Sequence, residues 1–304
     1  MGILGRSSTD GQPSRGFGGI RWWVLVLFAG YAAWSWLGNA KTDPYTGGNV
    51  HYGASVDEEA QLGLQAFQQV LSQERPLDSS DPTAKQIEGI ASRLVARASA
   101  VEEDLAAENS QPSPDLAKTF DWSVAVLESD QANAFCLPGG KMAVYTGLIP
   151  ITQNENAMAV VMGHEIAHAL LRHGSQRMAQ QKLVQMGQMA AGVALGNMDP
   201  QQQQMVMAAL GAGAQYGLIL PYGRNHETQA DEVGLMLAAA ACYNPHEAIP
   251  LWQRMSELGG GQRPPEFAST HPDPANRIQH LQSLMPKAEQ YFAKYCGGKS
   301  PPNL

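Results

Sequence analysis

The chain has 304 residues, of which 44% are hydrophobic and 16% charged, and its formal net charge is −8. This length suits one large domain or two small ones, and the apolar fraction is enough to bury a sizeable core. An acidic chain without a basic stripe is unlike nucleic-acid-binding proteins, so we expect no nucleic-acid partner.

The N-terminal region predicts a membrane anchor. Residues 1–19 are rich in Gly and Ser and form a flexible basic segment. Residues 20–37 carry one charge, Arg21, over about the minimum length of a membrane span, with tryptophans near both ends as in interfacial anchors. We expect a transmembrane signal anchor here. The alternative is a signal peptide that is cleaved near Ala40.

Flanking charges predict the orientation of this anchor. Arg6, Arg15 and Arg21 precede the span, whereas acidic residues dominate soon after it. By the positive-inside rule the N-terminus is cytoplasmic and the rest of the chain lies outside. Because Asp10 and the sparse arginines are unlike a mitochondrial targeting segment, we expect a single-pass protein of the bacterial inner membrane with its main domain in the periplasm. If the signal is cleaved, the protein is secreted to the periplasm.

The anchor is followed by a linker at 38–56, a main domain at 57–296 and a polar tail at 297–304. Hydrophobic periodicity and capping residues predict helices in seven segments of the domain, at 57–72, 83–106, 154–173, 176–195, 225–241, 245–258 and 274–294.

Two strands are expected, at 120–127 and 141–146, with a turn-rich stretch at 133–140 between them. These elements predict a mainly α fold with a small antiparallel β-sheet, of the α+β class. Residues 205–220 are apolar but short and contain Gln215, which favours a buried helix or hairpin over a second membrane-inserted segment.

Cysteine usage excludes a cysteine-rich scaffold. Cys136, Cys242 and Cys296 are an odd, widely spaced set without a CxxC motif. Such a set is no disulfide framework, redox motif or cysteine metal site. One bridge between Cys242 and Cys296 stays open as an alternative that the spacing does not favour.

Residues 164–168 read His-Glu-Ile-Ala-His within a predicted helix. Positions four apart share one helix face, so His164 and His168 can reach the same metal ion. Zinc takes nitrogen ligands in tetrahedral geometry, and Glu165 beside the first ligand is placed to act on a metal-bound water. The competing interpretation is chance, at roughly the one-per-cent level for a chain of this histidine content.

A catalytic zinc site needs a third protein ligand and an open fourth position. Five downstream residues can ligate a metal: His173, His226, Glu227, Asp231 and His271. Glu227 and Asp231 share a face of the helix expected at 225–241, so one can bind zinc while the other orients a ligand histidine. From these considerations alone, His226 and Glu227 are about equal as the third ligand.

Four blocks occur in one order along residues 57–285. They are Asn133–Gly140 with the strand leading to Leu148, Gly163–His168 with Arg172 and His173, Glu227–Asp231 with Gly234, and Thr270–Pro272 with Arg277. Together they resemble the HtpX and Ste-type zinc metallopeptidases, peptidase family M48. The resemblance implies a zincin-like metallopeptidase domain that binds one Zn²⁺ per chain and has polypeptides as substrates.

Carried over to this sequence, the resemblance implies that His164, His168 and Glu227 bind the zinc and that Glu165 is the general base. It also implies a place for His271 at the catalytic site, where it steadies the oxyanion or caps the metal in a resting form. Asp231 and Arg277 match residues that lie close to the ligands. The strand implied to hold an extended substrate comprises Gly139, Gly140, Lys141, Met142, Ala143 and Val144.

The expected function is therefore that of a membrane-anchored zinc endopeptidase that cleaves extended or misfolded proteins in envelope quality control. In the proposed chemistry, Glu165 takes a proton from water and later protonates the leaving amine. The substrate joins the sheet beside Lys141–Thr146, where the alternative is a plain structural edge strand. The alternative function is a zinc-stabilised chaperone or assembly factor with little or no proteolysis.

Overall fold

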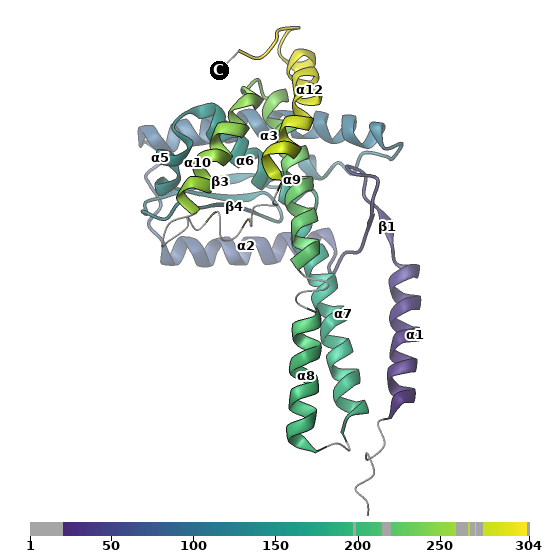
Figure 1. The fold of residues 1–304 in the computed structure, drawn as a ribbon. Coiled ribbons are helices and arrows are strands. Elements are labelled where there is room, and N and C mark those ends of the chain that lie inside the picture. Colours follow the sequence, from purple (N-terminus) through teal and green to yellow (C-terminus); the bar gives the residue numbers. More distant parts are fainter. Residues whose placement is uncertain are drawn as a thin grey trace, which may run out of the picture.

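The structure is a computed structural model that describes residues 21–196, 199–214, 220–259, 267, 271 and 276–302 (Figure 1). The flexible segment expected at residues 1–19 lies outside this part. The described chain is mainly helical, as expected, and consists of a body of helices around a small sheet and an arm that extends from the body.

Helices α2 (Val56–Gln73) and α3 (Pro82–Glu108) begin where the sequence supplies caps. Ser55 and Glu58 form a reciprocal capping box, in which each side chain accepts a hydrogen bond from the other residue's backbone N–H. Asp81 caps α3, and Pro82 occupies its first turn, where a missing N–H costs nothing. The apolar face of α3 then supplies much of the core.

A three-stranded sheet separates α2, which packs on one of its faces, from α3 and most of the core, which pack on the other face. Its strands are β3 (Ser123–Leu127), β4 (Ala134–Leu137) and β5 (Lys141–Tyr145), in the order β3-β5-β4. Because β3 runs parallel to β5 and β4 antiparallel to it, the sheet is mixed, and the expectation of a small antiparallel sheet is confirmed only in part. Two-residue strands β1 (Lys41–Thr42) and β2 (Asn49–Val50) form a separate antiparallel pair.

The expected substrate strand is not at an edge. β5 is hydrogen-bonded on both sides and all five of its residues are buried, so residues 141–144 have no free backbone edge to offer. The stretch expected to be turn-rich, Asn133–Gly140, contains β4, which lies at one edge of the sheet, with β3 at the other. Gly139 and Gly140 make the tight β4–β5 connection at φ values of +81° and +85°, which favour glycine.

Helices α6 (Glu155–Leu170) and α9 (Leu220–Ala240) pack against each other in the centre of the body. Asn154 caps α6 by accepting a hydrogen bond from the Ala157 N–H. The two helices approach most closely at a pair of glycines. A Cβ on Gly163 would lie 2.7 Å from the carbonyl oxygen of Gly234, and a Cβ on Gly234 only 2.6 Å from the His164 nitrogen. Any larger side chain would push the helices apart.

The remaining elements of the body are α10 (Ala248–Gly259), α12 (Arg277–Tyr295) and several single turns. These turns are α4 (Leu116–Thr119), η1 (Thr146–Leu148), α5 (Ile149–Thr152) and η3 (Pro245–Glu247). Helix α12 packs along α9 and closes that side of the core. Part of the linker expected at 38–56 is also held by the body, since Tyr45 is buried and donates a hydrogen bond to Glu102.

The arm consists of α1 (Trp22–Gly38), α7 (His173–Ala194) and α8 (Pro200–Ala214). Helix α1 packs along α7, and α8 folds back against α7. The expectation that residues 205–220 form a buried helix is wrong for their described part, because Met205 in α8 is 67% exposed. Among the described residues, no helix has both the length and the apolar character needed to cross a membrane.

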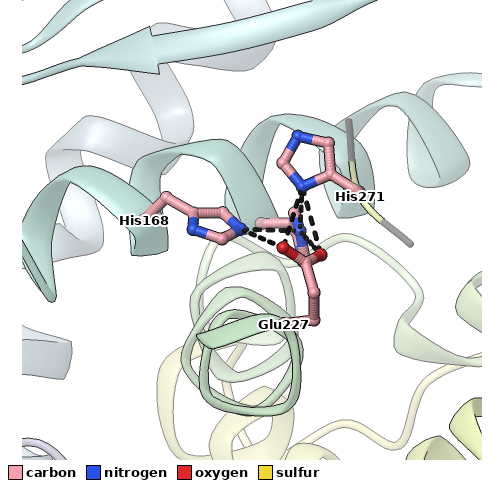
Figure 2. Close-up of side chains that lie close together, drawn as sticks. His168, Glu227 and His271 are labelled. Carbon is pink, nitrogen blue, oxygen red and sulfur yellow. Dashed lines mark hydrogen bonds and ion pairs between the residues drawn. The ribbon is translucent and has the colours of Figure 1, made fainter. Parts of the chain in front are cut away.

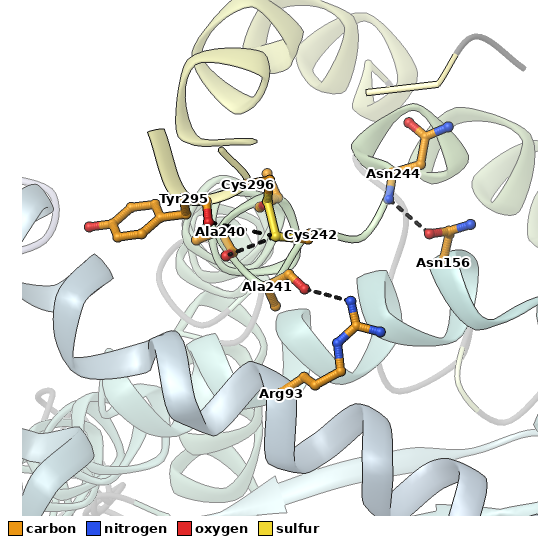
Figure 3. Close-up of a disulfide and its surroundings, with 9 residues drawn as sticks. Arg93, Asn156, Ala240, Ala241, Cys242, Asn244, Tyr295 and Cys296 are labelled. Carbon is orange, nitrogen blue, oxygen red and sulfur yellow. Dashed lines mark hydrogen bonds between the residues drawn. A yellow bond between two sulfur atoms is a disulfide. The ribbon is translucent and has the colours of Figure 1, made fainter. Parts of the chain in front are cut away.

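Cys242 and Cys296 form a disulfide, although their spacing did not favour one (Figure 3). The bridge joins the residues that follow α9 and α12. Because these helices lie side by side and end at the same point, the two Cα atoms are 5.6 Å apart, within the range for a disulfide. Because the two cysteines are 54 residues apart in the sequence, their spacing alone did not indicate that they lie close together.

Removing this bridge should destabilise the body. A disulfide that closes a loop of 54 residues lowers the entropy of the unfolded chain by an amount worth about 4 kcal/mol. We expect reduction to lower the urea concentration at the midpoint of wild-type unfolding. The reduced wild type should then unfold at the same midpoint as the Cys242→Ser/Cys296→Ser variant. That variant should not respond to reductant. Equal midpoints for oxidised and reduced wild type would contradict a stabilising bridge.

Candidate metal centre

Four side chains that can ligate a metal converge where α6 meets α9. They are His164 and His168 from α6, Glu227 from α9, and His271, and one ligand atom from each lies within 4.8 Å of all the others (Figure 2). His164 and His168 stand one turn apart on one helix face, as the motif predicts. Glu227, and not its neighbour His226, completes the cluster.

The spacing of the donor atoms suits a tetrahedral ion. The Nε2 atoms of His164 and His168 are 3.0 Å apart, and the Glu227 carboxylate lies 3.3 Å from the first and 3.5 Å from the second. Ligands at zinc distances on the corners of a tetrahedron are about 3.3 Å apart. His271 Nδ1 lies 3.1 Å from Glu227 and 3.3 Å from His164 Nε2, which makes it a fourth corner. These residues therefore fit a zinc ion.

His164 is oriented by an acid. Its Nδ1 lies 3.0 Å from Asp231 Oδ1, one turn after Glu227 on α9, so the proton sits on Nδ1 and the Nε2 lone pair faces the cluster. Arg277 donates a hydrogen bond to the same oxygen at 2.6 Å and stacks over Trp252. Asp231 and Arg277 thus lie where the resemblance implies, as an ion pair behind the first ligand.

His168 is oriented differently, by another histidine. Its Nδ1 lies 2.8 Å from Nδ1 of His173, and His173 Nε2 lies 3.1 Å from Oε1 of Gln229. Since the amide oxygen can only accept, His173 carries its proton on Nε2, and its Nδ1 accepts a hydrogen bond from His168. This fixes His168 as the tautomer whose Nε2 faces the cluster.

His226 supports this chain and stays outside the cluster. Its ring stacks on that of His173 at 4.0 Å, and its Nε2 lies 3.2 Å from Gln176 Oε1. Burial lowers the pKa of His173 well below its usual value and the pKa of His226 to about 4. Both rings are therefore neutral near pH 7. The sequence indicated His173 as a candidate ligand and as part of the second family block, but not as the partner of His168. The supporting role of His173 depends on α7 beginning at this residue, directly after Arg172 takes a left-handed conformation.

The electrostatics of the cluster favour a cation. Burial opposes charge on His164, but the neighbouring Asp231 and Glu227 carboxylates outweigh it and raise its pKa to about 9. Burial would raise the pKa of Glu227, but hydrogen bonds from His164 and His271 hold it well below its usual range. Two buried carboxylates that hold a proton so firmly would equally favour a divalent ion.

Glu165 lies beside the cluster without belonging to it. It is buried, and its Oε1 lies 3.4 Å from His271 Nε2. Burial raises the pKa of this carboxyl, while the nearby His271 and His164 oppose the rise. A carboxylate whose pKa is moved towards neutrality is suited to exchange protons with a water at the cluster.

Comparison with known proteins agrees with this site. Residues 95–285 match the sequence profile of peptidase family M48. The chain is 30% identical over 238 residues to a fission-yeast protein named "Mitochondrial metalloendopeptidase OMA1", which covers 77% of this chain and 63% of that protein. It is 33% identical over 177 residues to the human "Metalloendopeptidase OMA1, mitochondrial", covering 56% of this chain and 33% of the relative.

A bacterial relative covers more of the chain. The "Beta-barrel assembly-enhancing protease" of Escherichia coli is 26% identical over 261 residues, which are 84% of this chain and 49% of that protein. The chain therefore spans less than two thirds of the length of each of these relatives.

The histidine chain behind His168 predicts a specific loss of metal affinity. A His173→Phe variant keeps a ring to stack on His226 but has no acceptor for His168. Loss of such a supporting partner typically weakens metal binding by about 10–100-fold. We expect that loss in a zinc titration against a competing chelator, and partial recovery in His173→Gln, whose amide oxygen can accept.

His246 provides a matched control. It lies in η3 and pairs with Glu289 at 3.1 Å, apart from the metal centre, so His246→Phe should bind zinc as the wild type does. Unchanged zinc affinity in His173→Phe would show that His168 needs no partner at Nδ1.

Proposed function

Because this chain belongs to peptidase family M48, we propose that it is a metalloendopeptidase that uses one zinc ion, held by His164, His168 and Glu227, to hydrolyse peptide bonds of extended polypeptides. The observation that carries the proposal is the convergence of these three donors at zinc-compatible spacing, with the buried Glu165 beside them. Zinc at this place would polarise the scissile carbonyl and lower the pKa of water.

The residues of the chain supply the proton transfers. Glu165 accepts a proton from the attacking water and returns it to the leaving amine. Asp231 and Arg277 hold His164 in place, and His173 holds His168, so the donor atoms keep their geometry while charge develops on the substrate. Burial of His164, Glu165 and Glu227 keeps bulk water away from most of the group, which strengthens these interactions.

We assign substrate binding to β4 instead of β5. Strand β4 packs against α6, which carries the metal motif, and within the described residues it pairs with β5 alone. Its outer edge can therefore accept an extended peptide as an added strand, a mode that selects unfolded segments by their backbone. Phe267 already donates its N–H to the carbonyl of Ala132 just before β4, at one end of this edge.

His271 has a resting role in this proposal. With His271 Nδ1 at its fourth corner, the cluster is closed, whereas a hydrolytic zinc site needs one position for water and substrate. The ring of His271 stacks on Phe267 at 4.5 Å, the residue that also occupies the end of the β4 edge. Withdrawal of this pair would open the metal position and the substrate edge together.

We further propose that α1 holds the enzyme at a bacterial inner membrane with the body on the periplasmic side. Helix α1 has no buried residue, and its exposed side chains are largely aromatic and aliphatic. The Cys242–Cys296 disulfide is consistent with an oxidising compartment such as the periplasm. Action on misfolded envelope proteins is the physiological role that we propose, and the similarity to a "Beta-barrel assembly-enhancing protease" supports a role at the cell envelope.

A non-proteolytic function remains the second candidate because the cluster has four ligands. A closed four-ligand site is typical of structural zinc, so a zinc-stabilised chaperone or assembly factor of the cell envelope would show the same geometry. The two functions differ in whether Glu165 is needed.

A Glu165→Gln variant separates these functions. Gln cannot accept the proton, so we expect casein cleavage to fall by about 10²–10⁴-fold, while elemental analysis still finds one zinc per chain. Glu128→Gln, at an exposed carboxylate that pairs with Arg75, is the matched control and should cleave normally. Cleavage at the wild-type rate by Glu165→Gln would refute the assigned base. Zinc binding without cleavage in the wild type would favour the chaperone.

A further inference from the structure

The arm formed by α1, α7 and α8 has an unusual distribution of charge. No Asp, Glu, Lys or Arg occurs at residues 22–40, 183–196 or 200–223, which include most of its three helices. Charged residues occur only at the two ends of these runs. The end of the arm far from the body, its tip, carries Arg21 and Asp199, and the end next to the body, its root, carries Lys41 and Lys182. The Arg21 N–H donates to the carbonyl of Ala194 at 3.0 Å, so the charge-free runs of α1 and α7 lie at the same level.

Large apolar side chains are exposed on every helix of the arm, although the start of α8 also exposes Gln201, Gln202 and Gln204. Trp34 of α1 is 72% exposed, Met189 of α7 65% and Met205 of α8 67%. Each such side chain left in water forgoes the favourable free energy of its burial. Between the helices, an apolar cavity of about 620 Å³ is lined by Leu25, Phe28, Leu183, Leu195 and Val206. This surface needs an apolar partner.

The root of the arm contains charged side chains, unlike the charge-free middle of the arm, its shaft. At the root, a second cavity of about 750 Å³ is lined by apolar groups together with polar and basic ones, among them Lys41, His51 and Lys182. His51 stacks on Trp36 at 3.7 Å and bonds to its carbonyl, which ties the end of α1 to the body. Charged groups at both ends of a charge-free shaft, with tryptophans near those ends, match the headgroup and hydrocarbon layers of a bilayer.

We propose that the α7–α8 hairpin is immersed, next to α1, in the hydrocarbon region of a lipid bilayer. The inference rests on the proposed anchoring by α1 and extends it to α7 and α8. Of these, only residues from 205 onward carried an expectation about their environment from the sequence, that of a buried helix or hairpin in preference to a second membrane-inserted segment. Residues 183–196 span about 21 Å as a helix, shorter than a hydrocarbon core of about 30 Å. The lysines at the root therefore extend towards the headgroups on the side of the body.

Lipid is favoured over a second copy of this chain as the partner. The exposed apolar side chains occur on all three helices, α1 included, so no single face is set apart for a protein contact. The described hairpin also has no charged or ion-paired residue between Lys182 and Asp199 that would give a protein partner register. A bilayer, by contrast, surrounds the arm and requires no register.

Immersion of the hairpin would fix the distance between the active site and the membrane surface. The hairpin connects α6, which carries His164 and His168, to α9, which carries Glu227. Helix α7 also begins with His173, the residue that orients His168. With the hairpin in lipid, the metal centre stands above the membrane surface at a set distance, where membrane-proximal segments of other proteins are its accessible substrates.

Spin labels on the full-length protein in phosphatidylethanolamine–phosphatidylglycerol nanodiscs test this inference. Labels at Met189→Cys and Met205→Cys report on the hairpin and a label at Leu27→Cys on α1, all in a Cys136→Ser background. Leu62→Cys on α2 is the matched control, since Leu62 is a similarly exposed apolar residue of the body. Collisions with oxygen, which concentrates in lipid, are compared with collisions with a water-soluble nickel complex.

We expect the oxygen-to-nickel collision ratio at 189 and 205 to equal that at 27 and to exceed that at 62 several-fold. A low ratio at 189 and 205, with a high ratio at 27, would overturn the inference and leave anchoring by α1 intact. Low collision rates with both reagents at 189 and 205 would indicate a protein contact and also overturn it. A low ratio at 27 would refute the proposed anchoring itself.

Discussion

The close approach of α6 and α9 is the constraint on which the metal centre depends. Gly163 and Gly234 let the two backbones touch, and this contact places Glu227 of one helix against His164 and His168 of the other. Ligand geometry at a metal tolerates errors of only a few tenths of an ångström. A side chain at either glycine would therefore disturb the site without touching a ligand.

Each ligand histidine then has its own support, and the two supports differ in charge. His164 faces the Asp231–Arg277 ion pair, whereas His168 faces the neutral chain through His173 to Gln229. A second carboxylate behind His168 would add a negative charge to a buried site that already holds Glu165, Glu227 and Asp231. The neutral chain fixes the tautomer without that cost.

The local pattern of the sequence predicted most helices and the placement of His164 and His168 on one helix face, because helix periodicity and metal motifs depend on residues close in the chain. It left Glu227 and His226 about equal as the third ligand, and only the resemblance to family M48 favoured Glu227. The pattern did not predict which strand is at the edge. The four residues of β4 directly precede the Pro-Gly-Gly turn, so the whole stretch was interpreted as a turn. Strand order, moreover, depends on pairings between segments far apart in the sequence. The Cys242–Cys296 bridge and the exposure of α8 were misjudged for the same reason, since both depend on how α9, α12 and the arm pack.

Zinc content of the full-length protein tests the central claim most directly. Elemental analysis should find one zinc per chain in the wild type and a marked loss in Glu227→Ala. Glu232→Ala should keep its zinc, because Glu232 lies on the same helix but pairs with Lys287. A wild type without zinc after reconstitution at neutral pH, or full zinc occupancy in Glu227→Ala, would contradict the assigned metal centre.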